Sequence, residues 1–141
     1  TIAAGNYLGW KTTSASGTPT HLLVTFEYTA TVLSKSFMIT NPTADADGPV
    51  WRSPEDITII AVHGVLVGGT NLVGSLWQYD SDGAGAGSKV NTSDMTITST
   101  NVNDTTLSGA AITSGNYVGI KTTSVSGTPT RLIISFEYIQ S

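Results

Sequence analysis

The feature that most constrains this chain is an internal repeat. Residues 1–30, here the front copy, recur as residues 111–140, the back copy, at a constant offset of 110 residues. Both contain Gly-Asn-Tyr, then Lys-Thr-Thr-Ser, then Ser-Gly-Thr-Pro-Thr and finally Phe-Glu-Tyr, at the same spacing. A fixed period of this kind has to be settled before any other assignment, because it decides what one structural unit is. The sequence therefore predicts one complete module, residues 31–141, preceded by a duplicate of that module's end.

Each copy predicts a β-hairpin, with strands at about residues 6–14 and 20–28 in the front copy and a turn on Ser-Gly-Thr-Pro between them. Alternate residues of the second strand share one face of a sheet, and this face is apolar in both copies. These predicted assembly residues are Leu22, Val24, Phe26 and Tyr28 in the front copy and Leu132, Ile134, Phe136 and Tyr138 in the back copy.

The front copy has no second middle region to pack against within the chain. A two-stranded hairpin is marginally stable in water and needs a larger sheet to join. We therefore expect residues 1–30 either to complete a preceding module or to be donated to a neighbouring subunit.

The composition favours an all-β fold. Charged residues make up 11% of the chain, compared with about 25% in ordinary soluble domains, while strand-forming residues and glycine are frequent. The middle region predicts strands at residues 31–40, 50–52, 57–67, 72–79 and 95–100, a hairpin turn at 68–71 and a glycine-rich loop at 80–88. Short strands with turns about every ten residues predict an antiparallel β-sandwich, jelly-roll-like in its strand order.

Charge and hydropathy argue against two classes of partner. The net charge is −4 and the six basic residues are scattered, so no basic patch for nucleic acid is expected. No apolar run approaches 18 residues, so membrane insertion is not expected either. Cysteine is absent, which excludes thiolate chemistry and disulfides within these residues.

Two short acidic motifs resemble fragments of calcium-binding loops. Asp45 and Asp47 precede Gly48, and Asp80 and Asp82 precede Gly83, which places carboxylates at alternate positions before a glycine. Neither motif continues to the further oxygen ligands of a complete calcium loop. Calcium binding and simple Asx turns are the two interpretations, and the missing ligands favour turns, so we expect no cofactor.

No catalytic motif is recognisable, and we expect the protein not to be an enzyme. The sequence contains no nucleophile elbow and no zinc-protease motif, and no two carboxylates are predicted to share a cleft. Trp51, between two prolines in a short extended stretch, is a candidate for stacking on a surface glycan.

Four sequence segments carry a resemblance to known proteins. They are Phe37-Met38-Ile39-Thr40-Asn41-Pro42, Ile57-Thr58-Ile59, Gly68-Gly69-Thr70 and the closing Gly-Asn-Tyr to Phe-Glu-Tyr region of the back copy. Together they resemble β-sandwich modules of tailed-phage virion proteins and of repetitive extracellular surface proteins. The resemblance implies a structural role outside a cell or on a virion, with other copies or adjacent modules as partners. A glycan- or receptor-binding adhesion module is the alternative.

Overall fold

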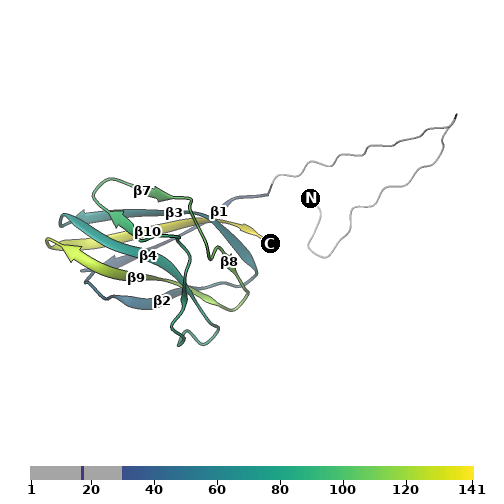
Figure 1. Ribbon diagram of the computed structural model, residues 1–141, viewed down its shortest axis with the longest axis horizontal. Helices are drawn as coiled ribbons and strands as arrows, with labels where there is room; N and C mark the ends of the chain where they lie inside the picture. Colours follow the sequence, from purple (N-terminus) through teal and green to yellow (C-terminus); the bar gives the residue numbers. More distant parts are fainter. Residues whose placement is uncertain (1–16, 18–29) are drawn as a thin grey trace.

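The computed structural model describes Gly17 and residues 30–141, and all regular structure in these residues is β-strand (Figure 1). No helix of a length and hydropathy suited to crossing a membrane is found among them. The ten strands are β1 (Leu33–Thr40), β2 (Asp47–Arg52), β3 (Ile57–Gly68), β4 (Asn71–Tyr79), β5 (Ser88–Lys89), β6 (Met95–Ile97), β7 (Val102–Asp104), β8 (Ala111–Ile112), β9 (Tyr117–Ser126) and β10 (Pro129–Gln140).

The strands form two antiparallel sheets that face each other. The first sheet has the order β1-β10-β3-β7, with β8 also pairing with β3, and the second has the order β2-β9-β4-β5, with β6 also pairing with β4. The predicted all-β sandwich is therefore confirmed. The chain passes from one sheet to the other at each connection between β1 and β4, and again between β9 and β10.

The core lies between the two sheets and is built by the inward-facing residues of the long strands. In β3, which matches the predicted central strand, the side chains of Ile57, Ile59, Val62 and Leu66 are at most 1% exposed. Gly64, in the middle of this strand, leaves space for a neighbour: a Cβ there would lie 2.9 Å from the Ile97 side chain. Its missing side chain lets Ile97 of β6 close over the middle of β3.

The predicted hairpin in the back copy is wrong. Strand β9 pairs with β2 and β4 in the second sheet, whereas β10 pairs with β1 and β3 in the first. The turn between them, which contains Gly127 at a φ of 79°, carries the chain from one sheet to the other. Two consecutive strands with a tight glycine turn fit either arrangement locally, and burial of their apolar residues from both sides decides for the sandwich corner.

The prediction for the connection after β3 is wrong in the same way. Residues 68–71 were predicted as a hairpin turn, but β3 and β4 belong to different sheets. This corner packs against the corner between β9 and β10, because the Thr70 backbone N–H donates to the Ser126 carbonyl at 2.8 Å. A Cβ on Gly69 would lie 2.9 Å from the Pro129 ring, so the contact requires glycine.

Candidate functional site

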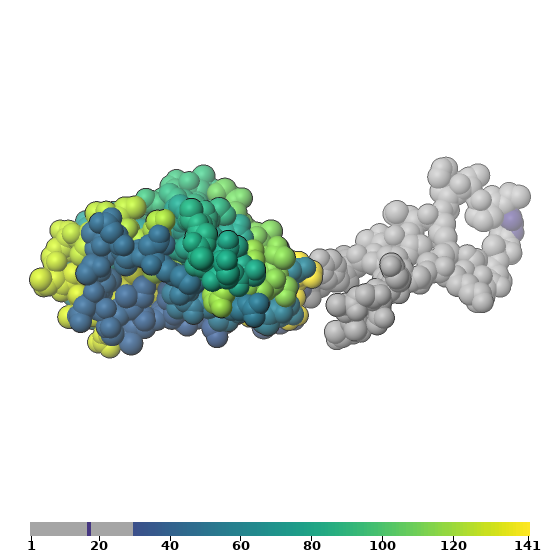
Figure 2. All heavy atoms as spheres, turned by 90° about the horizontal axis from the view of Figure 1, so that it is seen from below, coloured from purple at the N-terminus to yellow at the C-terminus, as the bar shows by residue number. Residues whose placement is uncertain are grey.

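The back copy supplies one interior strand to each sheet. Within the described residues, β1 pairs with β10 alone and β2 pairs with β9 alone. In Figure 2 the blue atoms of the β1–β2 region lie against the yellow-green atoms of the back copy. Removing residues 111–140 would therefore leave β1 and β2 without partners and split both sheets.

The residues predicted for assembly in the back copy are core residues of this chain. Leu132, Ile134 and Phe136 are 0% exposed, so they do not form a surface that a partner could contact. Tyr138 is partly buried and packs against the Phe136 ring, with 5.9 Å between the ring centroids. The prediction placed the right face toward a core, but that core belongs to the same chain. The front-copy residues Leu22, Val24, Phe26 and Tyr28 lie outside the described residues.

Trp51 packs against two aromatic rings of the back copy, and its stacking on a glycan stays a prediction. It lies on β2 at the open edge between the sheets, and its ring centroid is 5.5 Å from that of Phe136 and 5.9 Å from that of Tyr138. The Lys35 Nζ lies 5.8 Å from the same ring. The indole is partly buried and packs against the core.

A group of polar contacts fixes β9 to the middle of the chain. Lys121 Nζ lies 2.7 Å from Asp47 Oδ2 and 4.5 Å from the centroid of the Trp77 ring. The Tyr79 hydroxyl donates to the other oxygen of the Asp47 carboxylate. The Lys121 ammonium, followed by the Tyr79 hydroxyl, holds the pKa of Asp47 below its usual value. Burial, followed by the bond to Asp47, raises the pKa of Tyr79.

Sequence reasoning missed the role of Lys121, although a signal was present. A lysine recurs at this place in both copies of a chain that has few charged residues, which indicates a specific partner. Next to it, the buried Thr122 hydroxyl donates to the Thr43 carbonyl at 2.7 Å and accepts the Ala46 N–H at 2.9 Å. These bonds hold the turn before β2 against β9.

The acidic motifs serve as turns in the structure. Asp82 Oδ1 accepts the Ala84 N–H at 2.9 Å, the pattern of an Asx turn, and this bond lowers the pKa of Asp82. Asp80 Oδ1 accepts the Gly85 N–H at 3.2 Å, and Asp45 adopts a positive φ of 63° in its turn. Asp47 is held by Lys121 and Tyr79, as described above. Within residues 30–141, no three His, Cys, Asp or Glu side chains gather in a group suited to a metal ion.

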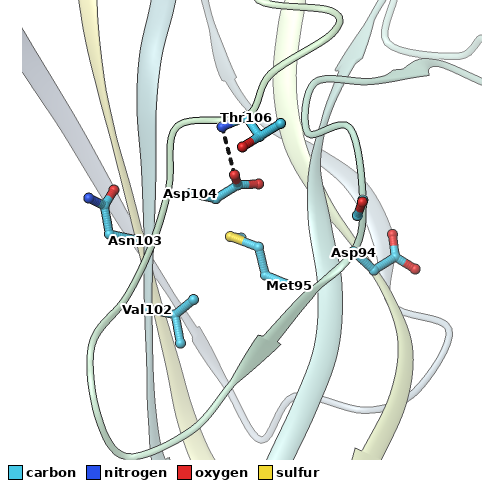
Figure 3. A pocket seen from close by; sticks show the side chains of 7 residues that line it. Asp94, Met95, Val102, Asn103, Asp104 and Thr106 are labelled. Atoms are coloured by element: carbon cyan, nitrogen blue, oxygen red, sulfur yellow. Dashed lines mark hydrogen bonds between the residues drawn. The ribbon is translucent and has the colours of Figure 1, made fainter.

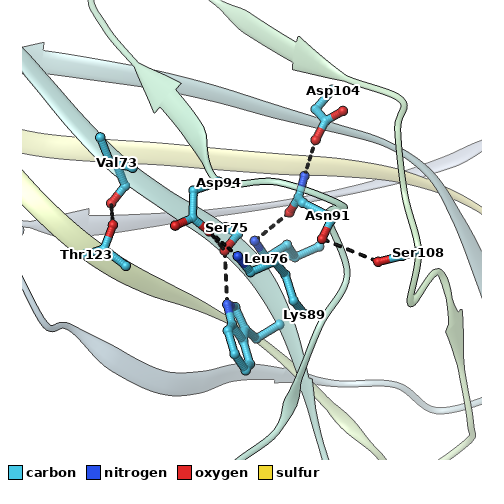
Figure 4. A network of polar contacts seen from close by, with 10 residues as sticks. Val73, Ser75, Leu76, Lys89, Asn91, Asp94, Asp104, Ser108 and Thr123 are labelled. Atoms are coloured by element: carbon cyan, nitrogen blue, oxygen red, sulfur yellow. Dashed lines mark hydrogen bonds and ion pairs between the residues drawn. The ribbon is translucent and has the colours of Figure 1, made fainter.

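A buried asparagine organises a second polar network that the sequence did not indicate (Figure 4). Asn91 is 0% exposed; its side-chain oxygen accepts the Leu76 N–H at 2.7 Å and its amide donates to Asp104 Oδ2 at 2.7 Å. The other Asp104 oxygen accepts the Thr106 N–H at 2.8 Å. The amide thus ties β4 of the second sheet to the β7 end of the first.

The hollow beside this network has no chemistry of its own. It has a volume of about 320 Å³ and is lined by Asp94, Met95, Val102, Asp104 and their neighbours (Figure 3). Asp94 binds Lys89 and accepts the Ser75 hydroxyl at 2.9 Å, and the Lys89 ammonium lowers the pKa of Asp94. Both carboxylates are therefore occupied by structural partners.

Comparison with known proteins does not assign this chain to a family. No family model matches the chain, and no curated protein matches it. One solved chain, from the structure described as "Bacillus endospore appendages form a novel family of disulfide-linked pili", is 17% identical over 86% of this chain and 100% of that chain, with a TM-score of 0.38. A TM-score this low does not establish a shared fold, so we argue function from this chain's own residues.

Proposed function

We propose that this protein is a structural module of an extracellular assembly, a virion appendage or a surface filament, which associates through β-sheet contacts with other copies or adjacent modules. The observation that carries the proposal is the duplication of one particular segment. The back copy supplies an interior strand to both sheets, and the chain contains that segment twice but its receiving region once. A surplus copy of the strands that close a sandwich is a built-in means of joining modules.

The polar groups of the described residues also support a structural, non-catalytic role. The carboxylates of Asp47, Asp94 and Asp104 each hold a strand or a turn in place through a hydrogen bond or an ion pair. Trp51 packs against Phe136 and Tyr138, which supports a structural role for this side chain.

Deletion of residues 1–30 tests the proposal. The strands from Leu33 to Gln140 close both sheets, so we expect residues 31–141 to remain folded and to lose the ability to assemble. Light scattering and negative-stain electron microscopy of the full chain and the deletion variant would measure assembly, and circular dichroism would measure folding. Unchanged assembly after deletion, or an unfolded 31–141 fragment, would contradict the proposal. The images would also show whether the assembly is a closed ring, a trimer or a fibre.

A further inference from the structure

We propose that the front copy binds the same receiving surface that holds the back copy, and that its partner is a β-sandwich module of this fold whose receiving surface is free. The receiving surface is formed by the edges of β1 and β3 in the first sheet and of β2 and β4 in the second. This inference rests on the proposed function and names the partner of the surplus segment. It follows from the contacts of residues 111–140, when each contacting residue is compared with the corresponding residue of 1–30.

The two copies are identical at 18 of 30 positions, and these include most of the residues whose side chains bind the receiving surface through polar groups. The exceptions are Ser114, whose hydroxyl donates to the Pro54 carbonyl, and Gln140, whose amide donates to Glu55; they correspond to Ala4 and Ala30. Lys121, which binds Asp47, corresponds to Lys11, and Thr122, which bonds to the turn before β2, corresponds to Thr12. The Gly115 N–H donates to the Ser53 carbonyl and the Asn116 carbonyl accepts the Ser53 N–H, each at 2.8 Å. Their counterparts are Gly5 and Asn6.

The positions that require glycine are also retained. A Cβ on Gly119 would lie 2.0 Å from the Gly48 carbonyl oxygen, because β2 and β9 approach closely there. The front copy has Gly9 at that place. Gly127 turns the chain between the sheets at a φ of 79°, and its counterpart Gly17 has a φ of 80°. The front copy therefore keeps the residues needed for a sandwich corner as well as those needed for the strands.

The contacts of β10 with the receiving surface are retained in the same way. Phe136 and Tyr138, which pack against Trp51, correspond to Phe26 and Tyr28. Glu137 Oε1 lies 3.4 Å from His63 Nε2, and Glu137 corresponds to Glu27. Each of these residues contacts either the middle of the chain or another back-copy residue that is identical in the front copy.

Of the twelve differences between the copies, nine fall at exposed positions or keep a buried apolar side chain; the other three, at the partly buried Val125, Ser135 and Ile139, correspond to Ala15, Thr25 and Thr29. Six of the differences are at positions that are exposed in the back copy, namely Ala111, Thr113, Ser114, Arg131, Ile133 and Gln140. The three exchanges at buried positions keep apolar side chains: Val118, Ile120 and Ile134 correspond to Leu8, Trp10 and Val24. A hollow of about 210 Å³ adjoins Ile120 and is lined by Ile39, Pro49, Val50 and neighbouring residues, so an indole at this position has room to extend.

The connection between the copies allows the exchange. Tyr138 of β10 pairs with Leu33 at the start of β1. Its counterpart Tyr28 precedes Leu33 with four residues between them, a common length for a hairpin connection. When the back copy is disabled, the front copy can therefore reach the β1 edge of its own chain. In the wild type β10 occupies that edge, so the partner of the front copy is a neighbouring module.

Disabling one copy at a time tests the inference. An aspartate at the fully buried Ile134 puts an unpaired charge into the core and should disable β10, while Val24→Asp does the same to the front copy. We expect full chains carrying Ile134→Asp or Val24→Asp to keep a cooperative unfolding transition, and the double variant to lose it. An Ile134→Asp chain as unfolded as the double variant would overturn the inference, as would a folded double variant.

Engineered disulfides would locate the front copy directly, because the chain has no cysteine of its own. Ser36 pairs with Ser135, the counterpart of Thr25. In the Ile134→Asp chain we expect Ser36→Cys and Thr25→Cys to crosslink, as the matched pair Ser36→Cys and Ser135→Cys does in an otherwise wild-type chain. If the matched pair crosslinks and the Ser36→Cys/Thr25→Cys pair does not, the inference is overturned. Both readouts report strand exchange, so they can succeed even if the wild-type chain forms no extracellular assembly.

Discussion

The packing role of Trp51 gives a prediction that separates a structural residue from a ligand-binding one. Trp51 contacts two aromatic rings, and tilted pairs of this kind contribute about 0.5–1.5 kcal/mol each beyond the burial of apolar area. Replacing a fully buried Trp or Phe by Ala costs about 3–5 kcal/mol. Because Trp51 is partly buried, we expect Trp51→Ala to lower the free energy of unfolding by about 2–4 kcal/mol.

That loss should be easy to measure. In a domain of this size, about 4 °C of melting temperature is lost per kcal/mol, so we expect a decrease of about 8–16 °C in thermal unfolding followed by circular dichroism. Trp51 lies outside the duplicated segment, so neither copy can replace it. Trp51→Phe should retain most of the ring contacts and lose less than half as much stability.

Val50→Ala is the matched control, because Val50 is the neighbouring residue on β2 and is 45% exposed. We expect it to change the free energy of unfolding by no more than about 0.5 kcal/mol. Equal stability of the Trp51→Ala and Val50→Ala variants would refute the packing argument and would leave Trp51 a candidate for glycan stacking.

Two further predictions concern the polar groups. The pKa values of Asp47 and Asp94 are lowered in the folded state by Lys121 and Lys89, so the ionised carboxylates stabilise the fold above the unfolded carboxyl pKa of about 4. That stabilisation is lost as the pH falls through the lower folded values, and the Asp47→Asn/Asp94→Asn variant should show a shallower loss of stability in denaturation measured from pH 6 to pH 2 than the wild type. Asn91→Ala leaves the buried Leu76 N–H without its acceptor and should cost about 1–3 kcal/mol in chemical denaturation, whereas the exposed Asn103→Ala should cost at most about 0.5 kcal/mol. A pH profile unchanged by the double substitution, or equal costs for the two asparagine variants, would contradict these assignments.

Part of the site was readable from the sequence because its signals are local. The repeat marks Gly9 and Gly119, Lys11 and Lys121, and Phe26 and Phe136 as positions with defined partners. Alternation correctly placed Leu132, Ile134 and Phe136 toward a core. What the repeat could not give was the identity of each partner, since Asp47 and Trp51 lie far away along the chain.

The sequence by itself determined the all-β class and the position of the long central strand, because strand propensity and the alternation of apolar residues are properties of neighbouring residues. Only the tertiary structure decided that β9 and β10 enter different sheets, that Trp51 packs against the core and that Asn91 is buried. A glycine turn fits a hairpin and a sandwich corner equally well. The choice between them depends on burying both strands among residues 47–79, which are distant in sequence and come together only when the two sheets pack.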